Sequence, residues 1–251
     1  MCEHCAEFRF YEELNDFLPE ERRKRAFEYR FNGNPGIKDP VEALGVPHTE
    51  VDLILANGES VGFDYRLQDG DRIAVYPMFE SLDITPIAKL RDTPLRRSAF
   101  VLDVHLGKLT KLLRLLGFDA KYRNDFHDAE IVDISVRENR IILTRDRRLL
   151  YAKVITHGYW LRSMDPEEQL REVIRRFDLT AHIRPFHRCL MCNGRISQVA
   201  KEEVVDLLEP LTRLYYDDFF RCLECGKIYW RGSHFDHMTE SLLEFLPDSD
   251  P

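Results

Sequence analysis

Four cysteines in the last third of the chain carry the clearest chemistry. Cys189/Cys192 and Cys222/Cys225 form two CxxC pairs that are separated by 29 residues. Each pair lets two thiolates reach one metal ion from a tight turn, and two such turns complete a closed tetrahedral site. The pattern therefore predicts one structural zinc ion held by these four ligands. Redox chemistry at a CxxC pair is the alternative.

Residues around these pairs bear on the same prediction. Gly194 and Gly226 follow the two pairs and are expected to suit the turn geometry. A third pair, Cys2/Cys5, stands at the N-terminus with His4 between its members. Nothing nearby in the sequence completes a second site, so we expect no metal there.

Aspartates next to predicted strands form the second chemical group. Asp103 ends the stretch VLD, Asp146 ends LTRD, and Asp128 opens a predicted helix after another strand. Ligands of open parallel sheets bind beyond the carboxyl ends of the strands, so these three carboxylates can converge at one rim. Mg²⁺ or Mn²⁺ prefers such ligands and suits phosphodiester cleavage. Helix N-capping is the alternative role for each aspartate.

Basic residues near these acids are candidates for binding nucleic-acid phosphates. Residues 87–178 carry 19 Lys and Arg against 14 Asp and Glu, although the whole chain has a net charge of -8. A basic segment inside an acidic chain suggests a polyanion such as nucleic acid, and solvated helix faces are the alternative. The candidates are Lys108, Arg114, Arg145 and Arg147.

Strand and helix patterns in the middle of the chain position these residues. AFVLD, FDAKYR and RIILTRD read as strands, and HLGKLTKLLRLLG, DAEIVDISVREN and RRLLYAKV read as helices. The first of these helices has leucines at helical spacing and Gly117 as its C-cap. Alternating strands and helices predict a parallel sheet covered on both faces.

The first 80 residues predict a small α+β domain. KDPVEALGV reads as a short helix with Asp39 as its N-cap, VDLILANGESV as a hairpin that turns at Asn57-Gly58, and DGDRIAVYP as a last strand. The order resembles the β-grasp fold of sulfur-carrier and ubiquitin-like proteins. Carriers end in a free Gly-Gly tail, whereas this chain continues through Pro77. This difference favours an adaptor or RNA-positioning role, and packing on the neighbouring domain is the alternative.

Three longer stretches resemble the Mut-seven C-terminal RNase family. They are FVLDVHLGKLTKLLRLLGFDAKY, DAEIVDISVRENRIILTRDRRLL and RCLECGKIYWRGSHFDHM. The resemblance implies a PIN-like nuclease domain with an attached zinc ribbon, often preceded by a ubiquitin-like domain. It also implies metal-dependent RNA cleavage, for which the motifs select Asp103, Asp128 and Asp146 as the catalytic acids.

Some details of the acidic site stay open. Asp125 or Glu130 could replace Asp128, because the start of a predicted helix is uncertain by a few residues. PIN nucleases often use a fourth acid after the last strand, and here no acid is evident before Asp165. The missing acid argues against a site with two metal ions and leaves a site with one metal ion open.

The expected fold class is multidomain, α+β and α/β. The predicted parts are a ubiquitin-like β-grasp domain at 6–80, a linker at 81–98, a PIN-like nuclease domain with a parallel sheet at 99–178, a zinc ribbon at 179–240 and an acidic tail at 241–251. His234 and His237, with Tyr229 and Trp230, are expected either to contact RNA or to pack the ribbon against its neighbour.

Together these patterns predict a cytoplasmic ribonuclease that uses Mg²⁺ or Mn²⁺ on RNA, including tRNA or another structured RNA. The segment MCEHCAEFRF is charged where a signal peptide is apolar, and no apolar run reaches the roughly 18 residues of a membrane helix. The ubiquitin-like domain could bind a protein partner. The alternative is a non-catalytic RNA-binding or adaptor protein. A receiver-like phosphoacceptor fits less well, because Val104-His105 follows Asp103 where a second acid is needed.

Overall fold

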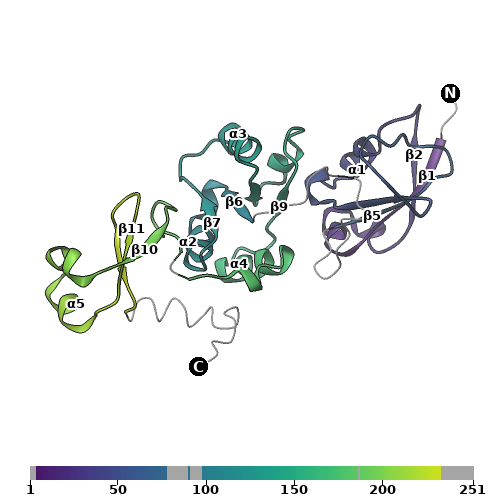
Figure 1. Ribbon diagram of the computed structural model, residues 1–251. Helices are drawn as coiled ribbons and strands as arrows, with labels where there is room; N and C mark the ends of the chain where they lie inside the picture. Colours follow the sequence, from purple (N-terminus) through teal and green to yellow (C-terminus); the bar gives the residue numbers. More distant parts are fainter. Residues whose placement is uncertain (1–3, 78–89, 91–97, 186, 233–251) are drawn as a thin grey trace. The chain divides into compact units, whose positions relative to one another are not determined.

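The computed structural model describes residues 4–77, 90, 98–185 and 187–232, and Figure 1 draws the other residues as a thin grey trace. The chain divides into two compact units. The first unit comprises residues 1–97 and 127–161, and the second comprises residues 98–126 and 162–251. The predicted linker, except Leu90 and Ser98, lies outside the described residues, as do the acidic tail, His234 and His237. The fold is mixed α/β, with an N-terminal sheet, a parallel sheet and a C-terminal antiparallel sheet.

The N-terminal domain is a five-stranded mixed sheet with one α-helix. Its strand order is β2-β1-β5-β3-β4, and only the central pair β1/β5 is parallel. This is the arrangement expected for a ubiquitin-like domain. The elements are β1 (His4–Phe10), η1 (Glu12–Phe17), η2 (Glu20–Arg22), β2 (Phe27–Phe31), α1 (Lys38–Ala43), η3 (His48–Glu50), β3 (Leu53–Ala56), β4 (Glu59–Val61) and β5 (Arg72–Tyr76), where η denotes a 3₁₀ helix.

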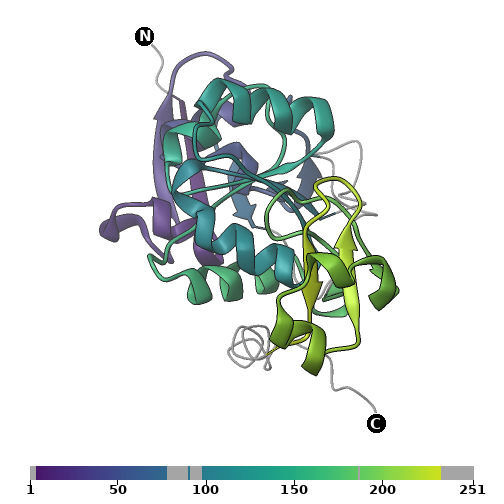
Figure 2. The ribbon, with the colours of Figure 1, turned by 90° about the vertical axis from the view of Figure 1, so that its left-hand side faces the viewer.

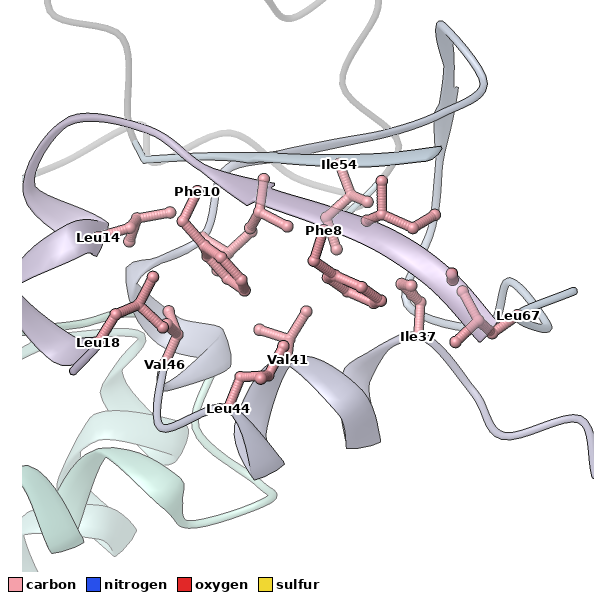
Figure 3. Packing of buried hydrophobic residues seen from close by; sticks show 14 of the residues in the cluster. Phe8, Phe10, Leu14, Leu18, Ile37, Val41, Leu44, Val46, Ile54 and Leu67 are labelled. Carbon is pink, nitrogen blue, oxygen red and sulfur yellow. The ribbon is translucent and has the colours of Figure 1, made fainter. Parts of the chain in front are cut away.

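Alternating residues of the strands build the core of this domain. Phe8 and Phe10 of β1 are 0% and 1% exposed and point toward Val41 and Leu44 around α1, whereas Arg9 between them is exposed (Figure 3). A strand with one buried face shows this period of two, because successive side chains point to opposite faces.

Local turn chemistry was predicted better than the helix start. Asn57 and Gly58 both have positive φ, 53° and 91°, between the antiparallel strands β3 and β4, which confirms the predicted hairpin turn. The predicted N-cap Asp39 is wrong. Helix α1 begins two residues earlier than predicted, at Lys38, with Ile37 as its N-cap, and the Gly36 carbonyl accepts the Asp39 N–H.

The first unit also contains α3 (Asp128–Glu138), β8 (Ile141–Thr144), η5 (Arg147–Tyr151) and β9 (Gly158–Trp160). Strands β8 and β9 pair in parallel; β8 lies in the predicted strand RIILTRD, whereas β9 was not predicted. The helix predicted over RRLLYAKV is wrong, because only a 3₁₀ segment of five residues forms there. Its C-cap, Ala152, already has extended backbone angles, so the chain turns toward β9 instead of adding helical turns.

The second unit supplies the other parallel pair. Strands β6 (Ala99–Leu102) and β7 (Asp119–Lys121) pair in parallel, and α2 (Gly107–Leu115) connects them after the 3₁₀ segment η4 (Val104–Leu106). Leu109 and Leu113 of α2 are 0% exposed, in agreement with the predicted apolar face. Helix α4 (Pro166–Arg176) and η6 (Thr180–His182) follow. No helix among the described residues has both the length and the apolar composition of a membrane crossing.

Gly117 ends α2 in a conformation that other residues resist. Its φ is +92°, its N–H donates to the Arg114 carbonyl, and the next N–H donates to the Leu113 carbonyl. This is the Schellman pattern, and it confirms the predicted C-cap. A Cβ atom on Gly117 would also lie 2.1 Å from the carbonyl oxygen of Arg184, so space as well as backbone angle requires glycine.

We expect Gly117→Ala to lower the free energy of unfolding by at least about 3 kcal/mol, because strain and a backbone clash add. The matched control is Gly58→Ala, since Gly58 has φ +91° but no atom within 4 Å of the place that a Cβ atom would take. The control should cost only about 1–2 kcal/mol, which is the effect of left-handed backbone alone. Urea unfolding followed by circular dichroism measures both, and equal losses would contradict the role assigned to the Arg184 contact.

The C-terminal part of the second unit is a small antiparallel ribbon. Strands β10 (Ile196–Val199), β11 (Phe219–Cys222) and β12 (Ile228–Trp230) pair in that order, and Figure 2 shows them in yellow-green beside the helical turns of the intervening segment. Those turns are η7 (Lys201–Glu203), η8 (Val205–Leu207) and α5 (Pro210–Tyr215). The buried apolar cluster of the ribbon is small, namely Val204, Leu208 and Phe219.

Within the first unit, the N-terminal domain contacts residues 147–160. We call this contact the internal interface. It is formed by Phe17, Gly45 and His48–Glu50 on one side and by η5, Ile155 and Trp160 on the other. Nε2 of His48 lies 2.9 Å from the Ile155 carbonyl oxygen, and its Nδ1 lies 2.6 Å from Oε1 of Glu42.

His48 should make this unit sensitive to acid. Burial, assisted by the positive charge of Lys38, lowers the pKa of His48 below its ordinary 6.5 although Ile155 and Glu42 oppose the shift. The unfolded chain therefore takes up a proton that the folded chain resists, and stability falls as the pH drops from about 6.5 toward the folded pKa. We expect urea midpoints to decrease over this window in the wild type and to decrease less in His48→Gln. An equal pH dependence in both proteins would contradict this assignment.

Candidate functional site

The four predicted cysteine ligands lie together in the structure. The Sγ atoms of Cys189 and Cys225 are 3.6 Å apart, those of Cys192 and Cys222 are 3.5 Å apart, and all four lie within 4.8 Å of one another. Tetrahedral zinc with bonds of about 2.3 Å requires sulfur atoms about 3.8 Å apart. The cluster therefore fits a metal ion such as zinc, and it agrees with the predicted ligand set.

Backbone amides of the two turns point at the sulfur atoms. The N–H of Cys192 donates to Sγ of Cys189, and the N–H of Cys225 donates to Sγ of Cys222, both at 3.5 Å. Such bonds stabilise thiolates, which are the form that binds metal. They also show that the two CxxC turns have the same local geometry.

The residues after each turn differ from the prediction in one respect. The left-handed positions are Asn193, with φ 70°, and Gly226, with φ 73°. Gly194 is needed for space instead, because a Cβ atom there would lie 2.8 Å from the Glu224 side chain and 3.0 Å from Sγ of Cys222. The prediction for Gly226 is thus confirmed, and the reason for Gly194 is packing against the second turn.

Tyr229 supports the cluster from β12. Its hydroxyl lies 3.0 Å from Sγ of Cys189 and accepts the N–H of Leu190 at 3.1 Å, so its own proton can point to the sulfur. Burial opposes ionisation of Cys189, but the hydrogen bonds from Tyr229 and from the Cys192 amide outweigh it and lower the pKa of Cys189 to about 7. Burial raises the pKa of Tyr229, which keeps the hydroxyl protonated. The Tyr229 hydroxyl is therefore engaged with the cluster.

The first CxxC turn is bonded to β7 of the same unit. The side-chain amide of Asn193 donates to Oδ1 of Asp119 at 2.7 Å, and its oxygen accepts the N–H of Ala120 at 3.0 Å. Arg188 donates to Oδ2 of Asp119 at 3.0 Å. Asn193 and Arg188 thus connect the first CxxC turn to β7, because they make hydrogen bonds with Asp119 and Ala120 of that strand.

Arg114 has a role other than the predicted phosphate contact. It is 4% exposed, and its guanidinium donates to the carbonyls of Ala120, Leu190 and Met191 at 2.9–3.0 Å. Burial lowers the pKa of Arg114, and the neighbouring Cys189 is the largest opposing influence. A buried guanidinium with these partners is not available to a phosphate, so the prediction for Arg114 is corrected: it joins α2 to the first CxxC turn.

Asp103 lies directly after β6 and is 7% exposed. Its carbonyl accepts the Leu106 N–H, which begins η4. Gly107 follows as the first residue of α2, and a Cβ atom there would lie 2.8 Å from the Tyr122 hydroxyl, which donates to the Val104 carbonyl. The glycine in the motif D-x-x-LGKL therefore lets a tyrosine hold the turn beside Asp103.

Asp146 lies two residues after β8 and is exposed. Its Oδ1 accepts the N–H of Arg148 at 2.8 Å, and its own N–H donates to Oγ1 of the fully buried Thr144. Thr144 thus orients the backbone at Asp146. Asp146 caps η5 with Oδ1. Because a carboxylate has two oxygen acceptors, this capping bond does not prevent Asp146 from binding a second partner.

Asp125, Asp128 and Glu130, the three alternative catalytic acids near the start of α3, differ in their contacts. Oδ1 of Asp125 pairs with Arg123 at 2.8 Å, and Oε2 of Glu130 accepts the N–H of His127 at 3.0 Å. Asp128 is exposed at the first position of α3, and the described residues supply it no hydrogen bond or ion pair. Of the three acids, Asp128 has the carboxylate that is least committed to other contacts.

Among the described residues, the four cysteines are the one group of three or more His, Cys, Asp or Glu side chains that could hold a metal ion. Asp165, the next acid along the chain, caps α4 by accepting the N–H groups of Glu167 and Glu168. Its carboxylate serves local structure.

The remaining predicted phosphate ligands differ in exposure. Lys108 is exposed on the first turn of α2, whereas Arg145 is half-buried beside Thr144. The guanidinium of Arg147 lies over the Trp160 ring, 3.7 Å from its centroid, and 5.1 Å from that of Phe17. Such cation–π contacts orient the group without neutralising it.

These elements define a mixed α/β protein with an N-terminal ubiquitin-like domain, a parallel sheet and a ribbon whose four clustered cysteines could hold a metal ion. The family model described as Mut7-C RNAse domain matches residues 98–242, and the model described as Mut7-C ubiquitin matches residues 3–83. Because the first match covers more than half of the chain, the chain belongs to the Mut7-C RNase family, which confirms the prediction. This membership suggests a nuclease-like function. No curated protein and no solved structure gave a significant match.

Proposed function

We propose that the protein is a ribonuclease that depends on Mg²⁺ or Mn²⁺ and cleaves RNA phosphodiester bonds. The match of residues 98–242 to an RNase domain carries this proposal. It is supported by the positions of Asp103 and Asp146, each of which closely follows the carboxyl end of a parallel strand. Ligand sites of parallel sheets are found at such strand ends.

Asp103, Asp128 and Asp146 are the residues that would hold the ion. A bound Mg²⁺ or Mn²⁺ supplies an activated water and neutralises charge on the phosphate. The protein's own part is to present ionised carboxylates: Thr144 orients the backbone of Asp146, and the tyrosine-held turn positions Asp103. Lys108, Arg145 and Arg147 would bind phosphates of RNA, including tRNA or another structured RNA.

The four-cysteine cluster is proposed to hold zinc in a structural role. Four sulfur ligands close the coordination shell and leave no position for a reacting water. Thiolate ligands need a reducing compartment, so the proposal includes a cytoplasmic location. A protein partner at the ubiquitin-like domain also stays a proposal.

Cleavage of a mixture of labelled single-stranded and structured RNA tests the catalytic proposal. The full chain is freed of weakly bound ions by passage over a chelating resin, because a soluble strong chelator would also attack the cysteine cluster. We expect cleavage after addition of Mn²⁺ or Mg²⁺ and none without them. Cleavage that is independent of added metal, or no cleavage with any metal, would refute the proposal.

The second candidate is a non-catalytic RNA-binding protein. The observation that favours it is the capping role of Asp146, whose Oδ1 accepts the N–H of Arg148, because a carboxylate can serve this purpose without a metal ion. This candidate predicts salt-dependent RNA binding without cleavage. A filter-binding titration of the same RNA at two salt concentrations, run beside the cleavage assay, separates the two candidates.

A further inference from the structure

The 3₁₀ segment η5 begins directly after Asp146 and is held by the N-terminal domain. The Tyr151 hydroxyl donates to the Gly45 carbonyl at 2.6 Å, and the Thr49 hydroxyl donates to the Leu150 carbonyl at 3.5 Å. Burial raises the pKa of Tyr151, which keeps this donor protonated. The residues that form these two hydrogen bonds are more than 100 positions apart in the sequence, and they belong to the same compact unit.

Strand β9 is held by the same side of the N-terminal domain. Oε1 of Glu50 accepts the Trp160 N–H at 2.5 Å, and the rings of Phe17 and Trp160 are 5.3 Å apart. Arg147 lies over both rings. The domain thus contacts the residue after Asp146, the end of η5 and the strand that pairs with β8.

Glu50 shows that this contact is part of the folded structure. It is 0% exposed, and a buried carboxylate is costly unless hydrogen bonds compensate it. One of those bonds comes from β9, so the N-terminal domain alone would leave this acceptor without that donor. A domain that served only as a tethered adaptor would have no reason to bury an acid against its neighbour.

The contact reaches the candidate catalytic acid through one hydrogen bond. Oδ1 of Asp146 accepts the N–H of Arg148, and Arg148 belongs to η5. The direction of the Asp146 carboxylate therefore depends on where η5 lies, and Tyr151 and Thr49 determine where η5 lies.

We propose that the ubiquitin-like domain is a positioning element of the nuclease site, in which Glu50, Thr49 and Gly45 hold η5 and β9 so that Asp146 and Arg147 are oriented for RNA cleavage. Glu50 and Tyr151 are the positioning residues. The inference rests on the proposed function for its catalytic consequence. The structural part of the proposal, that the domain holds η5 and through it Asp146, can be tested without measuring catalysis.

The test compares two buried carboxylates of the N-terminal domain. Glu50→Ala removes the acceptor that faces β9, whereas the control Asp71→Ala removes a buried acid that accepts hydrogen bonds from Asn57, Tyr65 and Gln68 within the domain. The direct readout is hydrogen exchange of the Arg148 amide, which reports its bond to Asp146. The second readout is RNA cleavage, separated into kcat and KM.

We expect Glu50→Ala to speed exchange of the Arg148 amide and to lower kcat, each about tenfold or more, with little change in KM, because misplaced catalytic groups lose rate before binding. Glu50→Gln retains an acceptor for the Trp160 N–H, so its exchange rate at the Arg148 amide and its kcat should both be close to the wild-type values. Asp71→Ala should change neither. Tyr151→Phe, which removes one hydrogen bond and keeps the ring, serves as the milder variant if Glu50→Ala does not fold.

Each outcome decides the proposal. Unchanged exchange of the Arg148 amide in both Glu50→Ala and Tyr151→Phe would overturn it, as would equal effects of Glu50→Ala and Asp71→Ala, which indicate a general loss of stability. If the wild-type protein cleaves no RNA, the proposed function fails. Amide exchange would then still show whether the domain holds the Asp146 segment.

Discussion

Asp146→Asn is expected to reduce RNA cleavage by at least about 100-fold while the protein stays folded. Asparagine has the same shape as aspartate, and its Oδ1 can still accept the Arg148 N–H that caps η5. What it loses is the negative charge, which a metal-binding carboxylate requires. Initial rates at saturating Mn²⁺ measure the effect, and circular dichroism verifies the fold.

Asp69→Asn is the matched control for this change. Asp69 is also exposed, and its Oδ1 also accepts a backbone N–H at 2.8 Å, in this case from Cys5. The same chemical replacement in the same type of contact should leave cleavage unchanged. If Asp146→Asn keeps wild-type cleavage, Asp146 is not a ligand of the reacting metal. If both variants lose cleavage, the loss comes from charge or folding in general.

Cys222→Ser is expected to abolish metal binding and to unfold the ribbon. Cysteine clusters of this type bind zinc with about 10–16 kcal/mol, which is free energy available for folding. Among the described residues, the apolar cluster of the ribbon has three buried members, Val204, Leu208 and Phe219, with a few partly buried hydrophobic residues against them, and so small a core does not stabilise a fold without metal. Elemental analysis of the purified protein should show about one zinc per chain in the wild type and almost none in the variant.

The effect should extend beyond the ribbon. Arg114 and Asp119 are bonded to the first CxxC turn, so loss of the turn leaves a buried guanidinium without two of its carbonyl acceptors. We therefore expect faster amide exchange in α2 and β7 of Cys222→Ser. Cys5→Ser is the control, because Cys5 is exposed in β1 and outside the cluster. Normal exchange in α2 and β7 of the metal-free variant would contradict this coupling.

Short-range patterns predicted a large part of the molecule. The clustering of the four cysteines, the turn at Asn57-Gly58 and the end of α2 at Gly117 were all predicted correctly. Each depends on the backbone angles or ligand chemistry of a few adjacent residues, which local sequence expresses directly. The same reasoning was wrong for RRLLYAKV, where an apolar pattern suited to a helix gives only η5, because residues of another domain hold this segment.

The role of individual side chains could be predicted only where their partners are adjacent in sequence. Arg114 has the spacing of a surface cation on a helix, yet carbonyls 76 and 77 residues away accept its hydrogen bonds. Glu50 reads as one more acid in an acidic domain, yet it is buried against Trp160. Local sequence patterns were sufficient to predict the clustered cysteines, the turns and the family. Which charged groups are buried and hydrogen-bonded could be seen only in the folded protein, because burial depends on contacts between segments that no local pattern relates.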